Sequence, residues 1–214
     1  MNISKKMIKL LLNPVTVAIL ICAVTLTYYY IDIPLTTVIA IFALKDNFPA
    51  LTWITFLGDG IIIIAPLLIS ALLFRYFYKH PIWEAQAWFL SLCVVISGLI
   101  CVLLKVMFGR ARPKLWFNSH EYGFYLFKIK GAYWSFPSGH TTMIFSLACG
   151  LSLLFPRYKI LFIILAIFIS FSRVLLIQHY LSDILIASYF ALLEVFCIAY
   201  FLHKKNWLSE AGLK

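Results

Sequence analysis

Long apolar runs are the feature that most restricts the fold of this chain. Of its 214 residues, 64% are hydrophobic and only 12% are charged, whereas a soluble domain carries about 25% charged residues. A helix needs about 20 apolar residues to cross the hydrocarbon core of a bilayer. The sequence predicts an all-α fold: a single-domain polytopic membrane bundle over residues 1–214, with six transmembrane helices at roughly 14–33, 51–74, 83–106, 138–155, 159–178 and 181–202.

The first apolar run is predicted to be an uncleaved membrane helix. Lys5, Lys6 and Lys9 precede it, as they would in a signal peptide. However, no small-x-small cleavage motif follows, and the run ends in three tyrosines beginning at Tyr28.

The formal net charge of +10 could suggest a nucleic-acid partner. The basic residues, however, stand in short clusters between apolar runs, as they do in cytoplasmic loops of membrane proteins. We therefore expect no nucleic-acid partner. The cysteines lie inside apolar runs without metal-ligand spacing, so they are expected to be small core hydrophobes: Cys22, Cys93, Cys101, Cys149 and Cys197.

Three groups of polar residues with defined spacing interrupt the apolar chain near the predicted helix ends. A charged side chain at a bilayer centre costs about 2.5–3.5 kcal/mol, so a membrane protein that keeps three such cations near its helix ends is expected to use them. The three groups are Lys105 and, after six residues, Arg112-Pro113; then Pro137-Ser138-Gly139-His140; then Ser172-Arg173, five residues, His179, three residues and Asp183.

This series resembles the three-part signature of the type 2 phosphatidic acid phosphatase family, membrane phosphatases related to vanadium haloperoxidases. The resemblance covers Lys105–Asp183. It implies that His179 forms a phosphohistidine, that His140 is the acid, and that the cations hold the phosphate. Water then hydrolyses the intermediate with no metal and no cofactor.

The residue types themselves suit phosphate chemistry. Arg112 and Arg173 carry planar forks that match phosphate oxygens, and Lys105 offers a compact charge. Pro137 suits the first position of a helix, where exposed N–H groups and the Ser138 hydroxyl would form an anion site.

Three further residues are expected to complete this site. Gly139 would let phosphate approach the backbone. His179 and Asp183, four residues apart, would share a helix face. The carboxylate would then accept the Nδ1–H of His179 and leave Nε2 free to attack phosphorus. Pro113 is expected to end the third span.

The sequence says less about the roles of the remaining polar and aromatic residues. Asp59, in the outer half of the second span, is a candidate supporting residue, and the sequence offers no account of Glu194. Arg110 and Lys114 are expected in a solvated loop. The outer-loop aromatics suit an interfacial belt better than a lid over the lipid: Trp116, Phe117, Tyr122, Phe124, Tyr125, Tyr133 and Trp134.

Lysine and arginine predict the orientation. With six spans, ten basic residues fall on the side of the termini and eight on the other. Setting aside the signature cations Lys105, Arg112 and Arg173 leaves ten against five. Both termini are therefore expected in the cytoplasm, with the signature at the outer-face helix ends of a bacterial inner membrane.

The leading functional hypothesis is a metal-independent phosphatase that hydrolyses a lipid phosphate mono- or diphosphate ester at the outer leaflet. One alternative is a lipid phosphotransferase that passes the phosphate to an acceptor hydroxyl, and another is a non-enzymatic membrane scaffold. The substrate stays open among phosphatidate, phosphatidylglycerophosphate, a polyprenyl diphosphate and lipid A phosphate. The sequence leaves the oligomeric state open as well.

Overall fold

The computed structural model describes residues 2–42 and 47–205, and every named element within these ranges is helical. The predicted all-α class is therefore confirmed for the described residues. Lys45 and Lys214, which entered the charge comparison, lie outside them.

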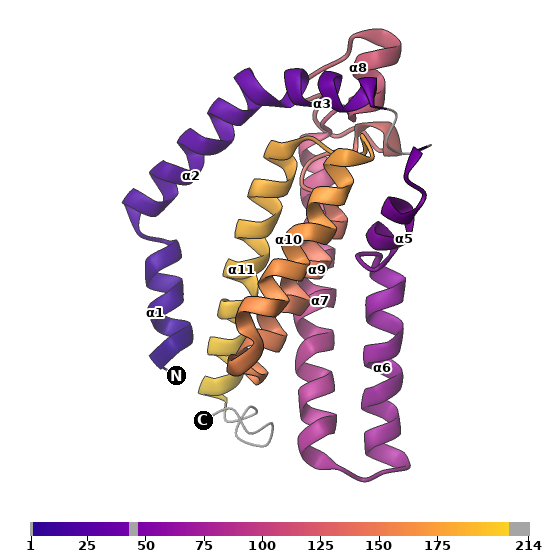
Figure 1. The fold of residues 1–214 in the computed structure, drawn as a ribbon. Coiled ribbons are helices and arrows are strands. Elements are labelled where there is room, and N and C mark those ends of the chain that lie inside the picture. Colours follow the sequence, from indigo (N-terminus) through magenta and orange to yellow (C-terminus); the bar gives the residue numbers. More distant parts are fainter. Residues whose placement is uncertain (1, 43–46, 206–214) are drawn as a thin grey trace.

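The chain begins with α1 (Asn2–Leu11), α2 (Pro14–Leu26), the π-helix η1 (Thr27–Ile31) and α3 (Asp32–Ile41) (Figure 1). The remaining elements are α5 (Ala50–Phe56), α6 (Gly60–Tyr76), α7 (Pro81–Phe108), α8 (Pro113–Ser119), the 3₁₀ turn η2 (Gly131–Tyr133), α9 (Gly139–Leu154), the 3₁₀ turn η3 (Pro156–Tyr158), α10 (Lys159–Leu175) and α11 (Leu181–Lys204).

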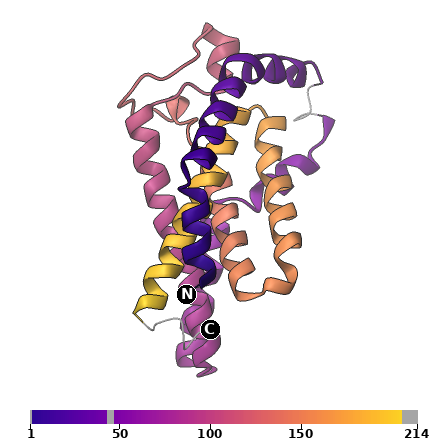
Figure 2. The ribbon, with the colours of Figure 1, turned by 90° about the vertical axis from the view of Figure 1, so that its left-hand side faces the viewer.

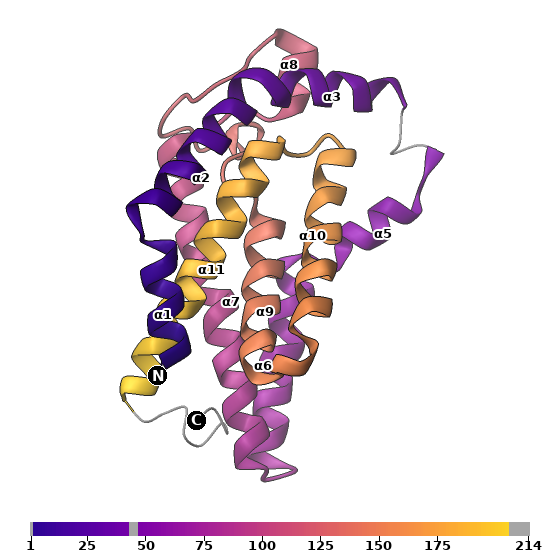
Figure 3. The same ribbon diagram turned by 60° about the vertical axis from the view of Figure 1, so that its left-hand side comes forward.

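The long helices α6, α7, α9, α10 and α11 form a bundle, and α1 and α2 run along its outside next to α11 (Figures 1 and 2). At one end, α3 and α8 lie over the turn between α10 and α11 (Figure 3). We call this the signature end, because α7 ends there and α9 begins there. The start of α1, the α6–α7 turn and the end of α11 lie at the opposite end (Figure 1).

Within residues 2–42 and 47–205, four helical stretches are long and apolar enough to cross a membrane: Pro14–Ile41, Pro81–Phe108, Pro156–Leu175 and Leu181–Lys204. A fifth is counted if α5 and α6, bent by 45° at their junction, form one span. The expected span at 138–155 is the shorter α9, of 16 residues. The structure therefore supports four or five candidate spans by length and composition, and the predicted count of six is not confirmed.

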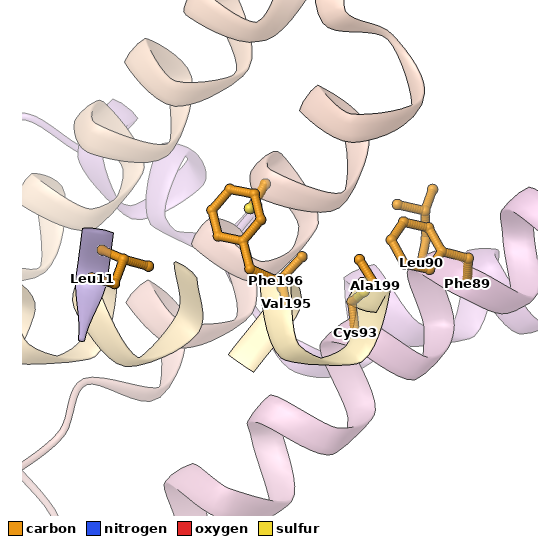
Figure 4. Packing of buried hydrophobic residues seen from close by; sticks show 8 residues of the cluster. Leu11, Phe89, Leu90, Cys93, Val195, Phe196 and Ala199 are labelled. Atoms are coloured by element: carbon orange, nitrogen blue, oxygen red, sulfur yellow. The ribbon is translucent and has the colours of Figure 1, made fainter. Parts of the chain in front are cut away.

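Two buried apolar clusters hold the bundle together. One buried cluster joins α1, α7, α9 and α11 through the residues labelled in Figure 4, together with Cys149: Leu11, Phe89, Leu90, Cys93, Val195, Phe196 and Ala199. A second cluster, which includes Ile63, Val94, Ile144 and Ile169, joins α6, α7, α9 and α10.

The cysteines are free thiols, as expected. Cys93, Cys101 and Cys149 are buried, as the core interpretation requires, and Cys197 is partly buried. The interpretation is wrong for Cys22, which is exposed on α2, a helix without buried residues. Because α2 lies along the outside of the bundle, its apolar side chains have no protein core to enter.

A glycine, and not Pro113, ends the third long helix. Gly109 caps α7 in the left-handed conformation, with φ of 55°, and its N–H donates to the Lys105 carbonyl at 2.9 Å. Pro113 instead begins α8, where its fixed φ and missing N–H suit the first turn. The expectation about Pro113 was wrong because a left-handed glycine cap stops a helix without proline.

We predict that Gly109→Ala lowers stability by about 1–2 kcal/mol, the cost of a left-handed conformation for an L-residue. A Cβ there would also lie 3.2 Å from the backbone nitrogen of Leu126. Gly131→Ala is the matched control, because nothing lies within 4 Å of its added Cβ. Thermal unfolding in detergent should show a lower midpoint for Gly109→Ala only. Equal midpoints for the two variants would contradict the cap.

Candidate active site at the signature end

Residues from four helices and one connecting segment meet at the signature end. The last turn of α7 brings Lys105, and the first turn of α9 brings His140. Arg173 lies in the last turn of α10, and Asp183 lies in the first turn of α11. His179 stands in the short connection between α10 and α11.

The His179 imidazole is fixed by a backbone carbonyl. Its Nδ1 lies 2.7 Å from the Ser135 carbonyl oxygen and 3.7 Å from Asp183 Oδ2. A carbonyl oxygen can only accept, so Nδ1 carries the proton and Nε2 carries the lone pair. The expected free Nε2 therefore follows from the geometry, but the nearer partner of Nδ1 is Ser135 and not Asp183.

Asp183 organises the segments around His179. Its Oδ2 accepts from the Ser135 hydroxyl at 2.6 Å and from the Tyr180 N–H at 2.9 Å, and its Oδ1 accepts from Arg110 Nη1 at 2.5 Å. The expected shared helix face is wrong, because α11 begins at Leu181, after His179. Asp183 caps this helix and reaches back across its start.

Lys105 supports the segment that leads into α9. Its Nζ donates to the carbonyls of Trp134 at 2.8 Å and Pro137 at 2.6 Å. A Cβ added at Gly139 would lie 3.5 Å from Lys105 Cε. The ammonium group thus lies next to the start of α9, and two of its three N–H groups donate to backbone carbonyls.

Ser138 is the N-cap of α9, and the helix begins at Gly139. The expectation that Pro137 takes the first helical position was therefore wrong by two residues. The Ser138 hydroxyl accepts from Thr141 Oγ1 at 3.0 Å and from the Thr141 N–H at 3.5 Å. Its N–H donates to the Asp183 carbonyl at 3.3 Å, which joins α9 to α11.

In the described part of the chain, Arg112 and Arg173 each donate one side-chain hydrogen bond, and each retains an unused donor. Arg112 Nη1 donates to Gln178 Oε1 at 3.2 Å, and Arg173 Nη1 donates to Thr55 Oγ1 at 2.9 Å. The Nε of each is buried without a hydrogen-bond partner among the described residues. Burial lowers the pKa of Arg112. Buried guanidinium groups with unused donors are suited to an anionic ligand.

The junction of α5 and α6 lies against His140. A Cβ added at Gly58 would come within 3.3 Å of His140 Cβ. Asp59 is the N-cap of α6, where Oδ1 accepts from the Ile61 N–H at 2.9 Å. The structure thus places Asp59 at a helix break and not within a continuous span. Thr55, the partner of Arg173, was missed, although the sequence Gly58-Asp59-Gly60 could have indicated this break.

The expectation of a solvated loop is wrong for Arg110, and for Lys114 it is right about exposure but wrong about the loop, because this residue belongs to a helix. Lys114 is exposed on α8, whereas the Arg110 side chain is fully buried. Its guanidinium contacts both Asp183 and Asp32. Asp32 was not recognised from the sequence because it lies far from the signature, at the end of an apolar run.

The outer-loop aromatics do not share one environment. Tyr122 is partly buried, and its hydroxyl donates to the Tyr28 carbonyl at 2.6 Å, so this residue belongs to neither an interfacial belt nor a lid. Phe117 and Phe124 are exposed, as a belt requires. Glu194 lies within α11, away from these residues, with Oε2 buried and without a hydrogen-bond partner among the described residues.

A family model described as the PAP2 superfamily matches residues 86–207, which is more than half of the chain. The chain belongs to the PAP2 superfamily. The matched region contains every residue of the signature from Lys105 to Asp183, so the predicted resemblance is confirmed. Together with the apolar helices, this membership makes the chain an integral membrane protein.

Curated relatives resemble the chain over the same region. Lipid A 1-phosphatases from Rhizobium johnstonii and Rhizobium etli are each 42% identical over 100 residues, which cover 45% of this chain. A lipid A 4'-phosphatase from Porphyromonas gingivalis is 33% identical over 122 residues, or 54% of this chain. The matched region spans 40%, 42% and 51% of these relatives' own lengths.

A solved structure shares the fold of this PAP2 superfamily member. The transmembrane PAP2-type phosphatidylglycerolphosphate phosphatase from Bacillus subtilis superposes with a TM-score of 0.61 and 22% identity. The match covers 87% of this chain and 96% of the other. It shows a common helical architecture.

Burial lowers the pKa of His179 to about 3, against an ordinary value of about 6.5. The folded protein therefore keeps this ring neutral, while the unfolded chain takes up a proton below pH 6.5. We predict that stability falls as the pH drops from about 6.5 towards 3. Thermal midpoints between pH 7 and 5 should fall more steeply for the wild type than for His179→Gln, which cannot titrate. Parallel slopes would contradict a buried neutral ring.

Proposed function

We propose that this PAP2 superfamily member is a metal-independent phosphatase that hydrolyses a lipid phosphate mono- or diphosphate ester through a phosphohistidine. The observation that carries the proposal is the fixed tautomer of His179. The Ser135 carbonyl holds the proton on Nδ1 and leaves a lone pair on Nε2, which is what a nucleophilic imidazole requires. Unused guanidinium donors of Arg112 and Arg173 lie at the same end of the bundle.

The first chemical step forms a bond between His179 Nε2 and phosphorus while the bond from phosphorus to the lipid oxygen breaks. His140 gives its proton to the departing oxygen as a general acid. The imidazole of His179 becomes cationic in this step, because Nδ1 keeps its proton. Asp183, with Oδ2 at 3.7 Å from Nδ1, is the nearby negative charge.

The second step breaks the phosphorus–nitrogen bond. A water molecule gives a proton to His140 and attacks phosphorus, and the electron pair of the broken bond returns to Nε2. Inorganic phosphate leaves, and both histidines regain their starting states. We propose that Lys105, Arg112 and Arg173 stabilise the negative charge of the phosphoryl group while it is transferred. The backbone at Ser138 and Gly139 completes the anion site. Asp59 is assigned a supporting place beside His140.

Among the described residues, no group of three or more His, Cys, Asp or Glu side chains is arranged to hold a metal ion. The mechanism above uses three fixed cations where a metal-dependent phosphatase uses a metal, so each step is complete without one. Metal independence remains a proposal that chelation tests.

The substrate class is proposed from the relatives. The chain is 42% identical to two lipid A 1-phosphatases and 33% identical to a lipid A 4'-phosphatase over the region that holds the signature. We therefore place a lipid A phosphate first among the substrates, ahead of phosphatidate, phosphatidylglycerophosphate and a polyprenyl diphosphate. We also propose that the site faces the outer leaflet of a bacterial inner membrane, with cytoplasmic termini.

We predict phosphate release from at least one of these lipids by the purified protein, undiminished by EDTA. His179→Ala should lose activity by roughly a thousandfold or more, because the nucleophile is absent. Lys114→Ala, at an exposed residue of α8, is the control and should retain activity. Activity that is lost in EDTA and restored by magnesium would overturn the mechanism. Phosphate that appears on an acceptor lipid and not in solution would instead identify a phosphotransferase.

We predict that an impermeant thiol reagent labels Asn118→Cys from outside the cell. Asn118 is exposed on α8 at the signature end, and Tyr158 is exposed at the opposite end, beside the start of α10. Tyr158→Cys should therefore react only after permeabilisation. Both variants should be made with Cys22, which is exposed, replaced by serine. The reverse pattern would place the site in the cytoplasm.

A further inference from the structure

A buried charge network extends from Asp183 to the N-terminal part of the chain. Arg110 donates from Nη1 to Asp183 Oδ1 at 2.5 Å and from Nη2 to Asp32 Oδ2 at 2.8 Å. The Arg110 side chain is 1% exposed, and both carboxylates are fully buried. One guanidinium thus serves two carboxylates that lie 151 positions apart in the sequence.

Asp32 is held in place at the start of α11. Its Oδ1 accepts from the Ser182 N–H at 3.1 Å, and its Oδ2 accepts from the Ser182 hydroxyl. A carboxylate is favoured at a helix N-terminus by the exposed N–H groups and the helix dipole. Asp32 directly follows the π-helix η1, and short π segments are frequent at functional sites.

Aromatic rings seal Arg110 away from water. Its guanidinium carbon lies within 4.6–5.4 Å of the ring centroids of Tyr180, Tyr28, Tyr122 and Phe124. Tyr122 also accepts from Arg110 Nη2 at 3.1 Å. Burial alone would lower the pKa of Arg110, but Asp183 and Asp32 outweigh it and raise the pKa. The guanidinium therefore stays charged, and the surrounding medium screens its interactions weakly.

Two carboxylates against one guanidinium leave one net negative charge in this cluster. Without Asp32, Arg110 would neutralise Asp183. With Asp32 present, Arg110 is shared, and Asp183 retains more of its negative charge beside His179 Nδ1. The cations that face the phosphate, Lys105, Arg112 and Arg173, would otherwise oppose any positive charge on this ring.

We propose that Asp32 and Arg110 are positioning residues of the active site: Arg110 orients Asp183, and Asp32 supplies the negative charge that stabilises the imidazolium of His179 when Nε2 bonds to phosphorus. The proposal rests on the function proposed above. Asp32 lies outside the matched family region, which covers residues 86–207, whereas Arg110 lies within it.

The test compares Asp32→Asn with Asp32→Glu and uses Thr36→Val as the control. Thr36 is buried on the same helix, and its hydroxyl donates to the Asp32 carbonyl, so Thr36→Val disturbs this segment without changing charge. Asn matches the shape of Asp but lacks its charge, whereas Glu keeps the charge and changes the shape. If Asp32 acts only through its shape, Asp32→Asn should retain the higher activity. If Asp32 acts through its charge, Asp32→Glu should retain the higher activity.

We expect Asp32→Asn to lower kcat about tenfold or more per folded molecule, with KM within roughly threefold, because each factor of ten corresponds to about 1.4 kcal/mol of lost transition-state stabilisation. Asp32→Glu should retain a higher kcat than Asp32→Asn, and Thr36→Val should stay within about threefold of the wild type. A kcat for Asp32→Asn equal to that of Thr36→Val would overturn the proposal.

Orthovanadate binding separates this proposal from the proposed function. Vanadate mimics the pentacoordinate phosphoryl group, so its affinity reports on the bond to Nε2 without any lipid. We expect Asp32→Asn to bind vanadate about tenfold more weakly than Thr36→Val, and equal affinities would overturn the network. A wild-type protein that binds vanadate but hydrolyses no lipid phosphate would contradict the proposed function alone.

Should Asp32→Asn fail to fold, the double variant Asp32→Asn/Arg110→Gln takes its place in both assays. The double variant removes the pair formed by Asp32 and Arg110. Asp183 then carries the cluster's one negative charge and keeps its hydrogen bonds from the Ser135 hydroxyl and the Tyr180 N–H. Because the orienting contact from Arg110 is lost while one negative charge remains beside His179, we expect vanadate affinity to fall, but by no more than about tenfold from that of the wild type. Complete loss of vanadate binding by a folded double variant would contradict the charge account.

Discussion

The buried carboxylate of Asp183 connects the parts of the signature end. It joins the segment before α9 through the Ser135 hydroxyl, the end of the α10–α11 connection through the Tyr180 N–H, and the segment after α7 through Arg110. Each of these partners comes from a different part of the chain, so the geometry around His179 exists only when all of them are assembled. Removing a partner from such a buried charge costs several kcal/mol, because the remaining charge is left uncompensated.

The site is consequently held rigid by hydrogen bonds at one side and has unused guanidinium donors at the other. On the rigid side, Lys105 holds backbone carbonyls and the Ser135 carbonyl fixes the His179 ring. On the other side, the Nε groups of Arg112 and Arg173 have no hydrogen-bond partner among the described residues. Donors arranged before the ligand arrives need little reorganisation during reaction, and their effect is large where water is scarce.

Much of this arrangement could be predicted from sequence spacing, and the exceptions have physical causes. The spacing within Lys105–Asp183 indicated the family, and the resemblance implied the nucleophile and the phosphate-binding cations that we propose. It could not show that a backbone carbonyl at Ser135 is the near partner of His179, since every residue has a carbonyl. It could not reveal Asp32 or the burial of Arg110 either, because their pairing depends on how α3 lies over the start of α11 (Figure 3). The number of membrane spans was harder still to predict. Because α9 is short and α5–α6 is bent, the apolar runs alone predicted more full-length spans than the described residues support.

The central claim is that Nε2 of His179 becomes covalently attached to phosphorus during turnover, and rapid trapping tests it most directly. A lipid A substrate with a radiolabelled phosphate should be mixed with excess protein, quenched in alkali within milliseconds to seconds, and the label mapped by peptide analysis. We predict an acid-labile, alkali-stable label on His179, absent from His179→Ala and longer-lived when His140 is replaced by alanine. A label on another residue, or complete turnover of the lipid with no phosphorylated protein at any time point, would contradict the mechanism.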